Sequence, residues 1–133
     1  MKSKFDPRRF LEFSKELLQK GISKDNEAKY RTINGRCYYA AFLYAIEQLG
    51  LEPEANHRKV QDKVMDLDRK LGKELTYLWI YRLGADYYLD TPALITIRDR
   101  EGEYMAKKTI KCNSEEAREC IARAERFFNG LGA

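Results

Sequence analysis

The sequence predicts an all-α protein, an up-and-down bundle of about five helices with a small β-hairpin inserted before the last helix. Three observations predict this fold class. Apolar residues recur at steps of three and four along most of the 133 residues. Capping residues and glycines bracket these segments. One short stretch instead alternates between β-branched and polar residues, which is typical of a strand.

The first helix is predicted over residues 7–20. Asp6 can accept a hydrogen bond from the first free backbone N–H groups, and Pro7 is suited to the first helical position. Gly21 can adopt the left-handed conformation that often ends a helix. The apolar residues between these limits form one stripe, which is typical of a helix that lies on a core.

A second, longer helix is predicted to continue to Leu49, with Ser23 or Asp25 as its capping residue. Residues 37–46 are apolar on every side of the helical wheel, and such a segment must be surrounded by other elements. Gly35 lies inside this helix although glycine costs about 1 kcal/mol relative to alanine there, so we expect a close approach to its backbone. This helix should form the centre of the fold.

Two further helices are predicted before the hairpin. The third has Asn56 as its cap, and Gly72 marks its end or a kink. The fourth covers residues 73–89, and the pair Thr91-Pro92 ends it because proline disfavours helical backbone in the residue before it. Its apolar residues form two stripes, one of Leu75, Leu78, Ala85 and Leu89 and the other of Tyr77, Tyr81 and Tyr88. Two stripes imply two packing partners.

Residues 93–112 form an insertion that is either a β-hairpin or a flexible charged loop. Ile95 and Ile97 alternate with polar residues, and Glu101-Gly102 is a turn-like pair. This pattern favours the hairpin.

The last helix is predicted to begin near Asn113 and to end at Gly130. Asn113 and Glu116 have the spacing of a capping box, in which each side chain bonds a backbone N–H group of the first turn. The helix presents one apolar face to the core. That face consists of Ala117, Cys120, Ile121, Ala124, Phe127 and Phe128.

The composition fits a single helical domain over residues 1–133. It is 44% hydrophobic and 35% charged, which is enough apolar surface for a core and enough charge for the exterior. The longest apolar run, residues 37–46, is about half as long as a membrane-spanning helix. No apolar stretch follows the basic N-terminus as it would in an export signal. We therefore expect a cytoplasmic protein without a membrane segment.

Charge and cysteine content narrow the function classes. The formal net charge is +4, and residues 1–36 carry ten Lys or Arg against five Asp or Glu. This basic end either meets phosphate or is a solvated helix face. Three widely spaced cysteines and one histidine support neither a disulfide framework nor a zinc site. No metal and no cofactor are expected.

Arg82 is the most informative position, because it lies in the middle of an otherwise apolar stripe of the fourth helix. A buried guanidinium needs a partner, and Asp86, one turn later, can reach it. This pair has two interpretations. It either ties the bundle together or belongs to a functional cleft.

Two motifs, in this order, resemble the HEPN family, whose name abbreviates "higher eukaryotes and prokaryotes nucleotide-binding". One is the stretch that contains Tyr38-Tyr-Ala-Ala-Phe42, and the other is Arg82-Leu-Gly-Ala-Asp-Tyr87. The sequence is most similar to the small prokaryotic branch of that family. The resemblance covers about residues 25–90 and the last helix. The segment 93–112 is longer than that branch normally has.

The resemblance implies a helical bundle that forms a homodimer and is often encoded beside a minimal nucleotidyltransferase in a toxin and antitoxin pair. In active members an Arg, followed five to seven residues later by a His, lines a cleft that cleaves RNA without a metal ion. Arg82 matches that Arg. Positions 87 to 89, however, are Tyr, Tyr and Leu, and the only histidine, His57, lies elsewhere.

The first function hypothesis is therefore a non-catalytic or weakly active HEPN-like protein that binds a nucleotide or an RNA phosphate. Arg82, Arg36 and Tyr39 are its candidate binding residues, because the planar donor fork of arginine matches phosphate. A homodimer is the expected assembly, with a minimal nucleotidyltransferase as a possible partner in a toxin–antitoxin or defence system.

The alternative is a metal-independent ribonuclease toxin. Its candidate catalytic residues are Arg82, which would stabilise developing charge, and Asp86 or His57 as the base. Tyr87 takes the position of the missing His, but a phenol titrates near pH 10 and is a poor base at neutral pH. A third hypothesis is an interaction module in which segment 93–112 offers a strand edge to a partner.

Overall fold

The computed structural model describes residues 5–21, 25–98, 102 and 104–132. It contains five helices and a two-stranded antiparallel sheet before the last helix, as the sequence predicts, so the chain is mostly helical and not strictly all-α. The elements are α1 (Arg8–Gln19), α2 (Asn26–Gln48), α3 (His57–Leu67), α4 (Arg69–Tyr87), β1 (Ala93–Arg98), β2 (Tyr104–Ile110) and α5 (Ser114–Gly130).

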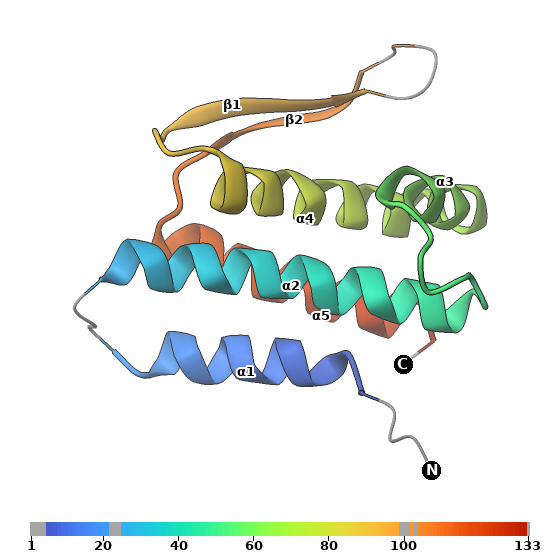
Figure 1. Cartoon of the computed structure of the whole chain (residues 1–133), viewed down its shortest axis with the longest axis horizontal. Coiled ribbons are helices and arrows are strands. Elements are labelled where there is room, and N and C mark those ends of the chain that lie inside the picture. The colour runs from blue at the N-terminus through green and yellow to red at the C-terminus, as the bar shows by residue number, and fades with distance from the viewer. Residues whose placement is uncertain (1–4, 22–24, 99–101, 103, 133) are drawn as a thin grey trace.

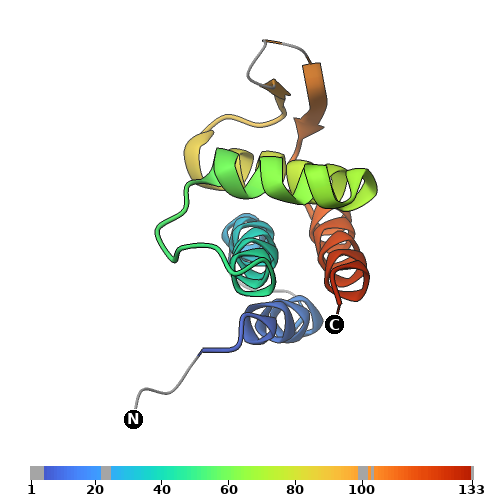
Figure 2. The ribbon, with the colours of Figure 1, turned by 90° about the vertical axis from the view of Figure 1, so that its right-hand side faces the viewer.

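Four long helices, α1, α2, α4 and α5, run side by side and alternate in direction (Figure 1). Looking along the bundle, α1, α2 and α5 appear end-on and α3 lies across them (Figure 2). The hairpin covers the side of α4 that faces away from α2 (Figure 1). No helix in the described part of the chain is both long and apolar enough to cross a lipid bilayer.

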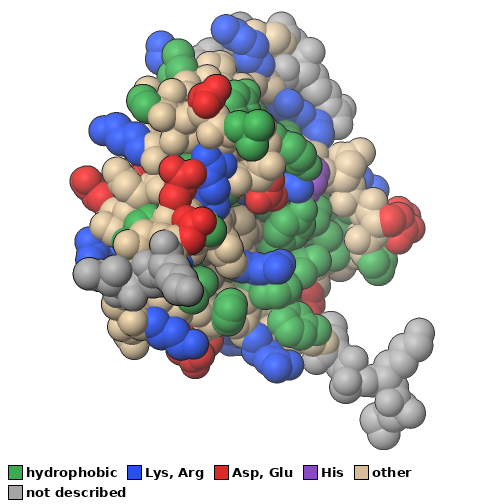
Figure 3. All heavy atoms as spheres, turned by 60° about the vertical axis from the view of Figure 1, so that its left-hand side comes forward, with side chains coloured by type: hydrophobic (Ala, Val, Ile, Leu, Met, Phe, Trp, Pro, Cys, Tyr) green, Lys and Arg blue, Asp and Glu red, His purple; other side chains and the backbone are tan. Residues whose placement is uncertain are grey.

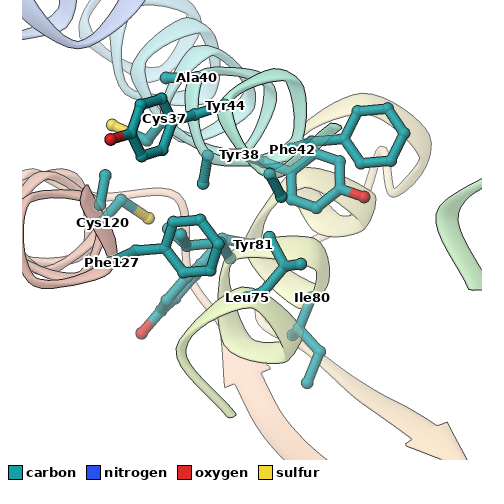
Figure 4. Packing of buried hydrophobic residues seen from close by; sticks show 14 of the residues in the cluster. Cys37, Tyr38, Ala40, Phe42, Tyr44, Leu75, Ile80, Tyr81, Cys120 and Phe127 are labelled. Carbon is teal, nitrogen blue, oxygen red and sulfur yellow. The ribbon is translucent and has the colours of Figure 1, made fainter. Parts of the chain in front are cut away.

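The core is built around α2, because its middle is enclosed by α1, α4 and α5. Within the segment 37–46, all residues but Tyr39 and Leu43 are buried. Figure 4 shows the rings of Tyr44, Tyr81 and Phe127 gathered between α2, α4 and α5. The prediction of a helix that is surrounded on all sides is confirmed.

An aspartate bonds the first turn of each of the first two helices, from the cap position in α2 and from one residue before the cap in α1. A carboxylate oxygen of Asp6 accepts a hydrogen bond from the Arg8 backbone N–H at 3.0 Å, and Asp25 accepts one from Ala28 N–H at 3.0 Å. The second cap is therefore Asp25; the alternative, Ser23, lies outside the described residues. Each contact satisfies a backbone donor that the helix itself leaves free.

The predicted boundary between the third and fourth helices is wrong. α3 ends at Leu67 and α4 begins at Arg69, because the carboxylate of Asp68 accepts hydrogen bonds from the backbone N–H groups of Lys70 and Leu71. Gly72 therefore lies in the first turn of α4. It allows close packing, since a Cβ there would lie 2.8 Å from the Cα of Met65.

The predicted end of the fourth helix is also wrong, by two residues. α4 ends at Tyr87, and Leu89 is 94% exposed instead of completing the apolar stripe. The other members of that stripe, Leu75, Leu78 and Ala85, are buried.

α4 contacts α2 and α5 as well as both strands of the hairpin, so it has more than one packing partner, as predicted. The tyrosine stripe is only partly correct: Tyr77 and Tyr81 contact α5, whereas Tyr88 lies after the helix and is 40% exposed.

The segment 93–112 is a β-hairpin, not a loop. The strands pair in antiparallel register from Ala93 opposite Ile110 to Arg98 opposite Tyr104, with a bulge between Ile97 and Arg98. The alternating residues Ile95 and Ile97 point to the core and are buried. The hairpin thus packs an apolar face onto α4.

The last helix begins at the predicted cap. The side chain of Asn113 accepts a hydrogen bond from Glu116 N–H at 3.0 Å. Glu116 reaches back beyond the usual capping box, because its carboxylate accepts from the backbone N–H groups of Lys111 and Cys112. All six residues predicted for the core face of α5 are buried.

Candidate functional site

Arg82 lies in the middle of α4, where the sequence predicts a guanidinium among apolar residues. Its side chain is 11% exposed. Two buried residues flank it on the same face, Leu78 one turn before and Ala85 nearly one turn after. A positive charge in this position is stable only when neighbouring groups replace the water that it has lost.

Three side chains surround the guanidinium of Arg82. Its Nε lies 3.0 Å from Oδ2 of Asp86. Its Nη2 donates hydrogen bonds to the hydroxyl of Tyr39 at 2.8 Å and to that of Tyr87 at 3.2 Å. The guanidinium carbon also lies 5.2 Å and 5.0 Å from the centres of the two rings, within range of a cation–π interaction. We call these four residues the arginine cluster.

The arginine cluster keeps Arg82 protonated. Burial by itself lowers the pKa of Arg82, but Tyr39, Tyr87 and Asp86 outweigh it, and the pKa is raised above its ordinary value. The Nε contact with Asp86 is an ion pair and not an aligned hydrogen bond. The carboxylate of Asp86 is 40% exposed, so solvent weakens this pair.

A polar pocket of about 220 Å³ lies beside the arginine cluster, between α2 and the end of α4. Its lining consists of Arg31, Thr32, Gly35, Arg36, Tyr39 and Asp86. Gly35 forms part of its wall, since a Cβ there would lie 3.5 Å from Oδ1 of Asp86. The close approach expected at Gly35 is not found, because this is an ordinary van der Waals distance at which a side chain would fit.

The structure brings two more predicted residues to this pocket. Tyr39 joins it to Arg82 from the neighbouring helix. Arg36 is exposed, and its guanidinium carbon lies 5.2 Å from the ring centre of Phe10 on α1. Arg36 therefore lies at the pocket with its charge facing solvent.

His57 lies apart from the arginine cluster, at the start of α3. Its Nδ1 is 2.6 Å from the hydroxyl of the buried Tyr38, and its ring packs between Phe42 and Trp79. Burial lowers the pKa of His57, and the positive charge of Arg82 lowers it further. No hydrogen bond joins His57 to Arg82 or Asp86 in the described structure. Figure 3 shows the imidazole at the edge of an apolar area with basic side chains around it.

A metal centre or a nucleophilic cysteine would be a second kind of functional site among the described residues. No group of three or more His, Cys, Asp or Glu side chains among them is arranged to hold a metal ion. The three cysteines are free and buried, and burial raises the pKa of Cys37 to about 12. At that pKa the thiol is not a nucleophile at neutral pH.

Sequence reasoning missed the role of Arg31. Its guanidinium reaches from α2 to four backbone carbonyls at the end of α4. These carbonyls lie 53 to 58 residues away in the sequence. No local sequence pattern could indicate this contact. The sequence shows only that no glycine follows the fourth helix as a cap, which means that its last carbonyls need other partners.

Comparisons with models of protein families, with curated proteins and with solved structures found no match to this chain.

Proposed function

We propose that this chain binds a phosphate group of a nucleotide or of RNA in the pocket between α2 and α4, and that it cleaves RNA weakly or not at all. The observation that carries the proposal is the pocket itself. Arg36 lines it, with its guanidinium over the ring of Phe10, and the guanidinium of Arg82 contacts Tyr39 and Asp86, which also line it. Two arginines in or next to the lining of one small pocket suit a phosphate group, because the planar donor fork of arginine matches phosphate.

The volume of the pocket suits one phosphate group and not a whole nucleotide. At about 220 Å³ it is smaller than the roughly 300–1,000 Å³ of pockets that enclose a drug-sized molecule. A phosphate fits inside, while the rest of a nucleotide or an RNA chain lies outside on the surface. Asp86 would orient the ligand, because its carboxylate repels an anion and leaves the side of Arg36 as the favourable approach.

The arrangement around Arg82 supports weak or absent catalysis. Tyr87 takes the place that a His would have in an active HEPN protein, and its hydroxyl accepts a hydrogen bond from Arg82. His57 is held by Tyr38 instead. A general base typically contributes about two to four orders of magnitude in rate, so we expect cleavage to be slow by that factor.

The assembly is a further part of the proposal. We propose a homodimer and, as the HEPN resemblance suggests, a minimal nucleotidyltransferase partner in a toxin–antitoxin system. Four exposed apolar side chains support an interface near the cluster, at the corner between α4 and β1: Tyr87, Tyr88, Leu89 and Leu94. Light scattering would measure the oligomeric state, and co-purification with the product of an adjacent gene would identify the partner.

Binding of AMP and of a short single-stranded RNA, measured by calorimetry and by fluorescence anisotropy, tests the phosphate site. We expect Arg36→Ala to weaken binding of both ligands at least fivefold without loss of fold, because Arg36 is exposed. Arg69→Ala is the matched control. It removes an exposed arginine from the other end of α4, 13 positions and therefore about 20 Å from Arg82. Equal affinities in the parent and Arg36→Ala would contradict the proposal.

An RNA cleavage assay in the presence of EDTA separates this proposal from the ribonuclease alternative. We expect little or no cleavage by the parent protein. Rapid cleavage that persists in EDTA and disappears in Arg82→Ala would instead establish an enzyme. Cleavage that survives the Arg82 substitution would come from a contaminating nuclease.

A further inference from the structure

The end of α4 lacks a cap of its own. The last four carbonyls of any helix have no partner within the helix, and a glycine in left-handed conformation often satisfies them. After α4 the chain continues through Tyr88, which is extended with φ −107° and ψ 106° and makes no backbone capping bond. The carbonyls of the last turn must therefore be satisfied from elsewhere.

The guanidinium of Arg31, on α2, satisfies two of these carbonyls, those of Gly84 and Ala85, and also reaches the carbonyls of Tyr88 and Leu89 just after the helix. Its Nη1 donates to the backbone carbonyls of Gly84 at 3.1 Å, Ala85 at 3.0 Å and Tyr88 at 2.8 Å, and Nη2 lies 3.5 Å from that of Leu89. The Arg31 side chain is 17% exposed; its bonds to Gly84 and Ala85 are partly buried, whereas those to Tyr88 and Leu89 are exposed. A positive charge at this position also complements the negative end of the helix dipole.

The carbonyls held by Arg31 flank the two residues that face Arg82 from its own helix. Asp86 and Tyr87 lie between Ala85 and Tyr88, on the turn that Arg31 holds. Arg31 forms no hydrogen bond with Arg82 in the described structure, yet it lines the same pocket as Asp86. A loosened turn would move the carboxylate and the phenol away from the Arg82 guanidinium together.

We propose that Arg31 is a positioning residue for the arginine cluster. By holding the last turn of α4 it keeps Asp86 and Tyr87 against Arg82, and so sets the geometry of the pocket. The effect on a ligand rests on the proposed function, whereas the positioning itself rests only on the contacts of Arg31. The two can therefore be tested separately.

The first measurement needs no ligand. The NMR signal of the Tyr87 ring carbon that bears the hydroxyl reports its hydrogen bond to Arg82, and Arg82→Met gives the reference for the broken bond. We expect Arg31→Gln to shift the signal toward that reference, and Arg31→Lys to restore it in part. Glu27→Gln is the matched control, because it removes only the charge of the exposed group that pairs with the Arg31 Nε. It should leave the signal unchanged.

A core variant separates positioning from general loss of stability. Ile121→Val, in the buried face of α5, should destabilise the fold without shifting the Tyr87 signal. A Tyr87 signal that is unchanged in Arg31→Gln, or that shifts equally in Ile121→Val, would overturn the proposal.

The second measurement is the affinity for AMP in the same variants. We expect Arg31→Gln to weaken it at least fivefold and Glu27→Gln to leave it unchanged. Lost affinity with an unchanged Tyr87 signal would mean that Arg31 contacts the ligand directly, which contradicts positioning. If the parent protein does not bind AMP or RNA, the proposed function fails, and the Tyr87 signal still decides whether Arg31 positions the cluster.

Discussion

The hydroxyl of Tyr38 lies 2.6 Å from Nδ1 of His57, and this contact ties the single histidine of the chain to the core. Tyr38 is 1% exposed, and burial raises its pKa. Burial likewise lowers the pKa of His57. Both groups are therefore neutral at pH 7, and the folded protein resists protonation of the imidazole.

The lowered pKa of His57 predicts how the free energy of unfolding depends on pH. Because the pKa of His57 is lower in the folded protein than its ordinary value of 6.5, the unfolded chain binds the proton first as the pH falls. The free energy of unfolding should thus decrease below about pH 6.5 and level off below the folded pKa. Urea unfolding of the parent and of His57→Gln between pH 5 and 8 checks this. A difference between the two that does not vary with pH would contradict it.

Loss of the Arg82 guanidinium should destabilise the fold moderately. Arg82→Met keeps the length of the side chain but leaves the hydroxyl of Tyr39 and the carboxylate of Asp86 without their partner. We expect a loss of about 1 to 2 kcal/mol, because hydrogen bonds to charged groups contribute about that much and solvent screens the half-exposed carboxylate. Chemical denaturation measures the change. Arg69→Met, at an exposed position, should stay within about 0.5 kcal/mol of the parent.

Two helical glycines should respond to alanine in opposite directions. At Gly35 a new Cβ meets only Oδ1 of Asp86 at 3.5 Å, so Gly35→Ala should stabilise the protein by up to about 1 kcal/mol through its higher helix propensity. At Gly72 the Cβ would lie 2.8 Å from the Cα of Met65. Gly72→Ala should therefore destabilise it by about 1 to 3 kcal/mol. Thermal unfolding should give a higher melting temperature than the parent for Gly35→Ala and a lower one for Gly72→Ala.

The capping carboxylate of Asp68 should stabilise the folded protein by holding the start of α4. Its carboxylate caps α4 through the N–H groups of Lys70 and Leu71, so Asp68→Ala should cost about 1 kcal/mol. Asp68→Asn should retain most of that contribution, because asparagine caps about as well as aspartate. Urea unfolding distinguishes the two variants. Equal losses in both would point to the charge of Asp68 and not to its capping bond.

Much of the fold could be predicted from local patterns. The caps Asp25, Asn56 and Asn113 lie at the predicted helix starts. The alternation of Ile95 and Ile97 identifies the hairpin, because a period of two places both on the buried face. These features depend on neighbours within a few residues, which the sequence shows directly.

The break between α3 and α4 and the geometry of the site could not be predicted in this way. An apolar period continues from Val64 to Leu71 and hides the break at Asp68, where a single residue leaves the helical conformation. The pairing of Arg82 with Asp86 follows from helical spacing. Its bond to Tyr39, 43 residues away, depends on how two helices pack, as the contacts of Arg31 do.

Gly84 faces the hairpin from the same turn of α4 whose carbonyl Arg31 binds. A Cβ at this position would lie 2.6 Å from Cγ2 of Ile110, so β2 rests directly on the helix backbone. The side chain of any larger residue at position 84 would clash with Ile110 and push β2 away from α4. The hairpin thus packs in direct contact with the helix that carries Arg82, two residues after that arginine.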